Sequence, residues 1–129
     1  MKNIILTFIL ITLIGCSQGD NINMKSQLLG KWKWVESSGG IDGRTETPEK
    51  TGNTVTIEFT GSTMKRFVNG NLESEVNYEI QSNPSIRTTQ DTDLIVYENG
   101  TKQSVELNAN FLVLYEECYD CFQHNYIKE

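Results

Sequence analysis

Two cysteines near the C-terminus, Cys118 and Cys121, have a Cys-x-x-Cys spacing that suits three kinds of chemistry. A redox pair needs a helix N-terminus to lower a thiol pKa, and a turn between strands lacks one. A zinc site needs two more ligands, of which His124 supplies at most one. A local disulfide that closes the last hairpin is natural outside the cytoplasm. We therefore favour a disulfide or free thiols, and we predict no metal site and no cofactor.

His124 is the only histidine and the first candidate for a general base. It alternates with Phe122 and Tyr126 at strand spacing, which favours a packed or rim position over a catalytic one. No spacing of serine, aspartate and histidine indicates a triad, and no glycine-rich loop precedes a helix. Glu116 and Glu117 are adjacent, so on a strand they point to opposite faces. We predict no catalytic residue and no enzymatic activity.

The composition indicates one acidic, folded domain. The chain has 129 residues, of which 37% are hydrophobic and 22% are charged, enough for one core and too few for two. Eleven Lys and Arg against 17 Asp and Glu give a net charge of −6. Because an acidic surface repels phosphate backbones, we expect no nucleic-acid partner.

The N-terminus has the features of an export signal. A basic start precedes an apolar run, residues 4–14, that is much shorter than the roughly 20 residues of a membrane-spanning helix. The next residues, Leu13–Cys16, resemble the bacterial lipobox. The resemblance implies a lipoprotein signal peptide over residues 1–15 and lipid attachment, palmitate included, at Cys16, which would anchor the protein in a membrane.

The residues after Cys16 suggest where the protein resides. Ser17 stands where some Gram-negative lipoproteins carry the Asp that retains them in the inner membrane, which favours the outer membrane over the inner one. Residues 16–26 are mostly small and polar, as is typical of a flexible tether. We expect a cell-envelope protein of a Gram-negative bacterium, with its folded domain over residues 27–129.

Short runs of alternating apolar and polar residues fill the chain from residue 27 onward. Gly30–Glu36 places both tryptophans on one strand face and both lysines on the other, and Asn69-Gly70 and Asn99-Gly100 are strong hairpin signals. About eight strands at a spacing of ~8–12 residues indicate an all-β, antiparallel up-and-down meander. Closure into a barrel removes both exposed edges, so we predict a barrel, with a two-sheet β-sandwich as the alternative.

One face of each strand should line the barrel interior. The two tryptophans either pack the barrel floor, which we favour, or stack on a ligand. A ligand would be small and apolar or amphipathic, and it would enter near the long loop of residues 37–52. The predicted interior residues are Trp32, Trp34, Val55, Ile57, Phe59, Leu72, Val76, Tyr78, Ile80, Leu112, Leu114 and Tyr126.

An ordered set of motifs resembles the small lipocalin-like lipoproteins of Gram-negative bacteria. The motifs are Leu28–Trp32, Gly39–Gly43 with Thr47-Pro48, Leu112–Leu114 and Cys118–Asp120, which together span nearly the whole mature domain. The resemblance implies a lipocalin-like barrel. A typical lipocalin also has a helix after the barrel and a late arginine stacked on the first-strand tryptophan. This chain has no such helix pattern, and Lys128 is its only late cation.

Two functions from different classes fit these observations. The first is a membrane-anchored, lipocalin-like module that binds a small lipophilic ligand in the envelope. The second is a filled barrel that presents its long loop or acidic face to another envelope protein. The two differ in whether the barrel interior holds a cavity.

Overall fold

The computed structural model describes residues 20–129. The predicted signal peptide, residues 1–15, and the predicted lipid attachment site, Cys16, lie outside the described residues. No helix among residues 20–129 is long and apolar enough to cross a membrane. The elements are α1 (Asp20–Leu28), β1 (Gly30–Gly39), β2 (Arg44–Glu46), α2 (Pro48–Thr51), β3 (Val55–Phe59), β4 (Thr63–Val68), β5 (Asn71–Pro84), β6 (Asp91–Tyr97), β7 (Lys102–Asn108), β8 (Phe111–Glu116) and β9 (Phe122–Lys128).

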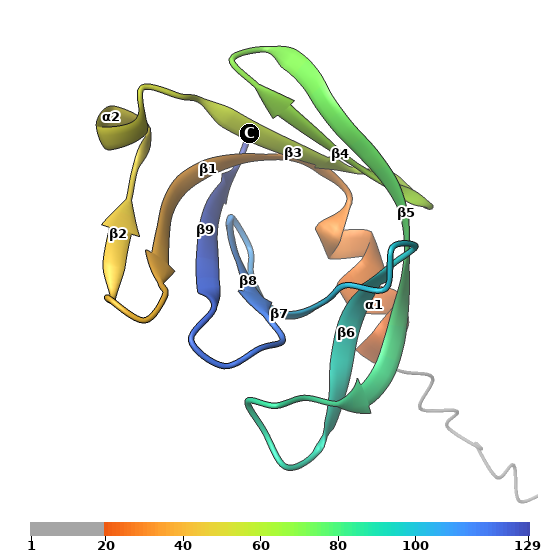
Figure 1. The fold of residues 1–129 in the computed structure, drawn as a ribbon. Coiled ribbons are helices and arrows are strands. Elements are labelled where there is room, and N and C mark those ends of the chain that lie inside the picture. The colour runs from red at the N-terminus through yellow and green to blue at the C-terminus, as the bar shows by residue number, and fades with distance from the viewer. Residues whose placement is uncertain (1–19) are drawn as a thin grey trace, which may run out of the picture.

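The strands form a closed antiparallel barrel (Figure 1). Hydrogen-bonded neighbours follow the order β1-β3-β4-β5-β6-β7-β8-β9, and β9 returns to pair with β1. The short strand β2 adds to the far end of β1, outside this ring. The predicted all-β class and the eight-stranded antiparallel barrel are therefore confirmed, with one extra strand. The sandwich alternative is wrong, because the strands belong to a single sheet that closes on itself.

Alternation and turn chemistry explain how the sequence forms these strands. In β3, Val55, Ile57 and Phe59 are buried in the barrel, and the residues between them are partly exposed. Between β4 and β5, Asn69 and Gly70 have φ values of 50° and 81°. A two-residue hairpin needs two positive φ values, and Asn-Gly is the pair that adopts them most readily.

The helix α1 lies across one end of the barrel and closes it (Figure 1). Leu28 is fully buried there beside Trp32, and the Trp32 indole N–H donates to the Leu28 carbonyl at 2.7 Å. The Lys128 ammonium lies 4.2 Å from the centroid of the Trp32 ring, within cation–π range. The same ammonium donates to the Leu29 carbonyl. The tryptophan, the helix end and the last strand are thus joined at one point.

Two segments expected to lack regular structure contain it. Residues 20–26, assigned to a flexible tether, are helical as part of α1. The C-terminal end of α1 buries Leu28 against the barrel. Tertiary packing of this kind stabilises short helices that would not form in isolation. The loop of residues 37–52 contains the end of β1, all of β2 and α2. Thr47 caps α2 by accepting a hydrogen bond from the Lys50 N–H at 3.3 Å.

The prediction that Leu72 faces the interior is wrong, since its exposed fraction is 54%. Arg66 of β4 pairs with Ser74, and the next residue, Phe67, pairs with Leu72. Glu73 is therefore the extra residue of a β-bulge, and the bulge reverses the alternation of β5 on its N-terminal side. Strict alternation from Val76 would have turned Leu72 inward.

Substitution of two leucines tests which side chains face the barrel interior and which face outward. Leu112 is fully buried, whereas Leu72 is mostly exposed. We expect Leu112→Ala to lower the free energy of unfolding by about 2–5 kcal/mol, because it leaves a cavity in the core. The matched Leu72→Ala should change it by less than about 0.5 kcal/mol. Urea unfolding followed by tryptophan fluorescence measures both values, and equal losses would contradict the assignment.

Candidate functional site

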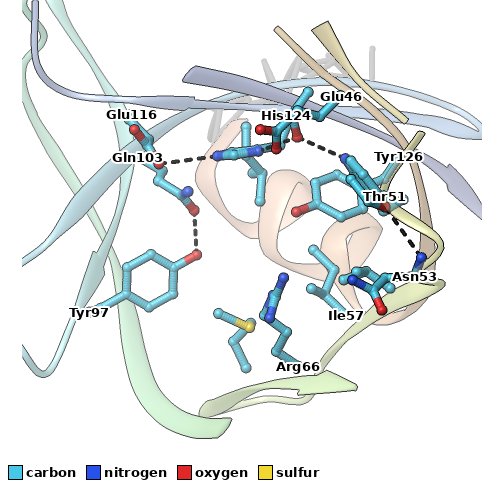
Figure 2. A pocket seen from close by; sticks show the side chains of 15 residues that line it. Glu46, Thr51, Asn53, Ile57, Arg66, Tyr97, Gln103, Glu116, His124 and Tyr126 are labelled. Atoms are coloured by element: carbon cyan, nitrogen blue, oxygen red, sulfur yellow. Dashed lines mark hydrogen bonds and ion pairs between the residues drawn. The ribbon is translucent and has the colours of Figure 1, made fainter. Parts of the chain in front are cut away.

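A cavity of about 440 Å³ occupies the end of the barrel that α1 does not close. Figure 2 shows its lining side chains, with α1 behind them. A volume of this size lies in the range of small-molecule sites, about 300–1,000 Å³. The lining residues are Trp34, Ser37, Glu46, Thr51, Asn53, Val55, Ile57, Met64, Arg66, Tyr97, Gln103, Leu114, Glu116, His124 and Tyr126.

The predicted interior residues divide into two groups, one along the cavity and one in the barrel floor. Of the floor residues, Phe59 and Tyr78 pack edge to face with ring centroids 5.3 Å apart. Val76 and Ile80 pack against the core and are only partly buried. The cavity group is Trp34, Val55, Ile57, Leu114 and Tyr126. The fully or nearly fully buried floor group is Trp32, Phe59, Tyr78 and Leu112.

A chain of hydrogen bonds lines one wall of the cavity (Figure 2). The Trp34 indole N–H donates to Ser37 Oγ at 2.8 Å, and Ser37 Oγ lies 2.6 Å from His124 Nδ1. His124 Nε2 lies 3.1 Å from Glu116 Oε1. An ionised carboxylate can only accept, so Nε2 carries a proton, and in the neutral ring Nδ1 then accepts from the Ser37 hydroxyl. With a neutral ring, every bond in the chain therefore runs in one direction, from Trp34 to Glu116.

A hydroxyl, an imidazole and a carboxylate in this order are the parts of a nucleophile relay. Here the Ser37 side chain is 5% exposed, and the Trp34 N–H occupies one of the lone pairs on its oxygen. A hydrogen bond to that oxygen weakens it as a nucleophile. We therefore interpret the chain as a polar wall of a binding cavity.

Two tyrosines contribute neutral hydroxyls to the cavity, Tyr126 beside His124 on β9 and Tyr97 on β6. The Tyr97 hydroxyl donates to Gln103 Oε1 at 2.6 Å. Burial, with the neighbouring tyrosines Tyr126 and Tyr78, raises the pKa of Tyr97 far above its ordinary value. Burial likewise raises the pKa of Tyr126, against the opposing charge of Arg66. Both hydroxyls thus keep their protons at any physiological pH.

The cavity contains both positively and negatively charged side chains. Arg66 projects into it from β4 (Figure 2) and forms an ion pair with Glu73, the bulge residue of β5. Glu46 and Glu116 contribute carboxylates. Together with the aromatic and aliphatic lining, these groups make the cavity amphipathic. A fitting ligand has an apolar body and a small polar part.

Sequence reasoning missed several cavity residues, and one of them carried a usable signal. Leu112 and Leu114 were predicted to face inward, and continued alternation along β8 places Glu116 inward too. Glu117 then faces the other way, and its carboxylate accepts hydrogen bonds from Ser85 Oγ at 2.7 Å and the Ile86 N–H at 2.8 Å. No comparable signal identified Ser37, Tyr97 or Gln103.

Cys118 and Cys121 form a disulfide in the turn between β8 and β9, with their Cα atoms 5.6 Å apart. The turn directly follows Glu116, so it lies at the rim of the cavity. The Phe122 N–H donates to Glu116 Oε2 at 3.2 Å, which joins the turn to the polar wall.

A second hollow, of about 640 Å³, lies between α1 and the strands β5 and β6. Leu29 and Ile80 supply its apolar surface, and most of its polar residues, including Lys25 and Glu79, are exposed surface groups. It lacks the buried hydrogen-bond chain of the barrel cavity. We therefore take the barrel cavity as the candidate site.

No protein-family model, curated protein or solved structure matches this chain. The fold itself defines the class of protein as far as the described residues go. It is an eight-stranded antiparallel barrel, closed at one end by α1 and hollow at the other.

Ser37 links Trp34 to His124 in the hydrogen-bond chain, and this role can be tested by substitution. We expect Ser37→Ala to lower the free energy of unfolding by about 1–3 kcal/mol, because it leaves the buried Trp34 N–H without an acceptor. Ser38→Ala, on the opposite face of the same strand, should change it by less than about 0.5 kcal/mol. Urea unfolding gives both values. Similar effects of the two variants would show that the hydrogen-bond chain has no structural role.

Proposed function

We propose that this protein is a membrane-anchored, lipocalin-like lipoprotein of the bacterial cell envelope that binds a small lipophilic ligand in its barrel cavity. The observation that carries the proposal is the amphipathic cavity of about 440 Å³ at the open end of the barrel. The interior is packed at the floor and hollow at the mouth. This favours ligand binding over a filled barrel that acts only as an interaction module for another envelope protein.

The lining suits a ligand with an apolar body and a polar end. Trp34, Ile57 and Leu114 offer apolar surface in the depth of the cavity. Nearer the rim, Gln103 and Glu116 offer hydrogen-bonding groups. Polar groups at defined positions beside apolar surface fix the orientation of a ligand and give specificity.

The anchor is supported by the sequence. The apolar run of residues 4–14 and the lipobox-like Leu13–Cys16 favour export and lipidation, and Ser17 favours the outer membrane. Lipid at Cys16 would leave only residues 17–19 between the anchor and the start of α1. The barrel would then stand close to the bilayer that contains the apolar molecules it binds.

Ligand binding is tested on protein purified from membranes in mild detergent. Native mass spectrometry should detect a bound small molecule that organic extraction removes. A fluorescent fatty-acid analogue should then bind the emptied protein. Met64→Trp fills the cavity and should weaken this binding at least tenfold, because Met64 lines the cavity wall.

Leu72→Trp is the matched control, since Leu72 lies outside the barrel at a mostly exposed position. It should leave the affinity for the analogue unchanged. Equal binding to wild type and Met64→Trp would place the ligand elsewhere and overturn the assignment of the cavity.

Lipidation is tested independently by Cys16→Ser. The variant should keep its signal peptide and incorporate no radiolabelled palmitate, because the thiol that accepts the lipid is gone. Electrophoretic mobility measures the retained signal peptide, and autoradiography measures the palmitate. A variant that has the size of the mature parent and still incorporates palmitate would contradict the anchor.

A further inference from the structure

The fold brings a carboxylate to the Cys-x-x-Cys turn. Glu116, Cys118 and Cys121 each place a ligand atom within 4.8 Å of the other two. His124 is not in this cluster, but it lies beside it, because its Nε2 is 3.1 Å from Glu116 Oε1. The sequence alone predicts no zinc site, because Cys118 and Cys121 provide only two of the four ligands that zinc needs. The register of β8 and β9 brings Glu116 to the cysteines and places His124 next to Glu116, so that both can reach a metal held by the thiolates.

We propose that the reduced form of this turn binds a zinc ion through the thiolates of Cys118 and Cys121, the carboxylate of Glu116 and Nε2 of His124. Zinc in proteins takes four ligands in tetrahedral geometry, drawn from sulfur, nitrogen and carboxylate oxygen. Two thiolates, one imidazole and one carboxylate complete that set of four ligands. The site is separate from the proposed ligand cavity in its chemistry, although Glu116 and His124 line both.

The disulfide must be reduced before the metal binds. A dithiol reductant donates two electrons and two protons, the Cys118–Cys121 bond breaks into two thiols, and the reductant becomes a cyclic disulfide. Zinc then displaces one proton from each thiol. The site therefore exists in the reduced protein and is absent from the oxidised one.

The surroundings of His124 suit a metal ligand. When Nε2 binds the metal it gives up its proton, and the neutral ring carries a proton on Nδ1 instead. Nδ1 lies 2.6 Å from Ser37 Oγ, which can accept that hydrogen bond. Metal-bound histidines almost always donate their other N–H to such a partner, which fixes the ring orientation.

The backbone holds the turn against β1. Gly39 has a φ of 140°, and a Cβ atom at this position would lie 2.3 Å from the Cys121 carbonyl oxygen. Only glycine permits this close approach of the two strands. The Phe122 N–H also donates to Glu116 Oε2, so the carboxylate is oriented toward the turn before any metal arrives.

The test uses the full chain with Cys16→Ser, so that Cys118 and Cys121 are its only thiols. The protein is reduced with a dithiol, freed of reductant without oxygen, and titrated with Zn²⁺ against a chromophoric chelator. Reduced protein should bind one zinc ion, and oxidised protein should bind none. Co²⁺ in place of Zn²⁺ should show the intense absorption of thiolate coordination.

Substitutions identify the ligands. Glu116→Gln and His124→Gln should each weaken zinc binding at least tenfold in the reduced protein. Asp120→Asn is the matched control, because it removes an exposed carboxylate from the same turn without touching the proposed ligands. Its zinc affinity should equal that of the parent.

The inference is overturned if the reduced parent binds zinc no better than its Cys118→Ser, Cys121→Ser double variant. It is equally overturned if Glu116→Gln and His124→Gln both retain the parent affinity, which would indicate chelation by the thiols alone. The oxidised parent serves as an internal check of folding. Neither result bears on the proposed ligand cavity, which Met64→Trp tests separately.

Discussion

The pairing of β1 with β9 is the interaction on which the rest of the structure depends. It joins the first and last strands of the barrel, and its register places Trp32 opposite Lys128, Trp34 opposite Tyr126 and Ser37 opposite His124. These three levels are the floor, the cavity wall and the rim of the candidate site. A slip of one residue would turn each inward side chain outward, so the closed end and the site exist in one register only.

Two β-bulges determine which residues reach the cavity. The register of β1 shifts between Trp34 and Glu36, so that Trp34 and Ser37 both face inward although three positions separate them. The bulge at Glu73 acts in the same way on β5, where it turns Leu72 outward and places a carboxylate beside Arg66. The inward position of Ser37 and the ion pair of Arg66 thus depend on the two places where the alternation is broken.

This explains how much of the molecule the sequence could predict. Strands with unbroken alternation, such as Val55–Phe59, were assigned to the correct face, and Asn69-Gly70 marked a turn that the structure contains. The floor of the barrel follows from such signals. The inward position of Ser37 could not be predicted, because a bulge leaves no mark in the pattern of apolar residues. Nor could its contact with His124, which joins residues 87 positions apart.

The polar wall links the cavity to the cysteine turn through the two nitrogens of His124. In the oxidised protein with a neutral His124 ring, the Ser37 hydroxyl donates its proton to Nδ1, so it offers the cavity no donor. A metal on Nε2 would place the proton on Nδ1, and Ser37 Oγ would then accept from both Trp34 and His124. Its own proton would turn toward the cavity. Metal binding would therefore add one hydrogen-bond donor to the wall, and a ligand that accepts it would in turn strengthen metal binding by the same factor.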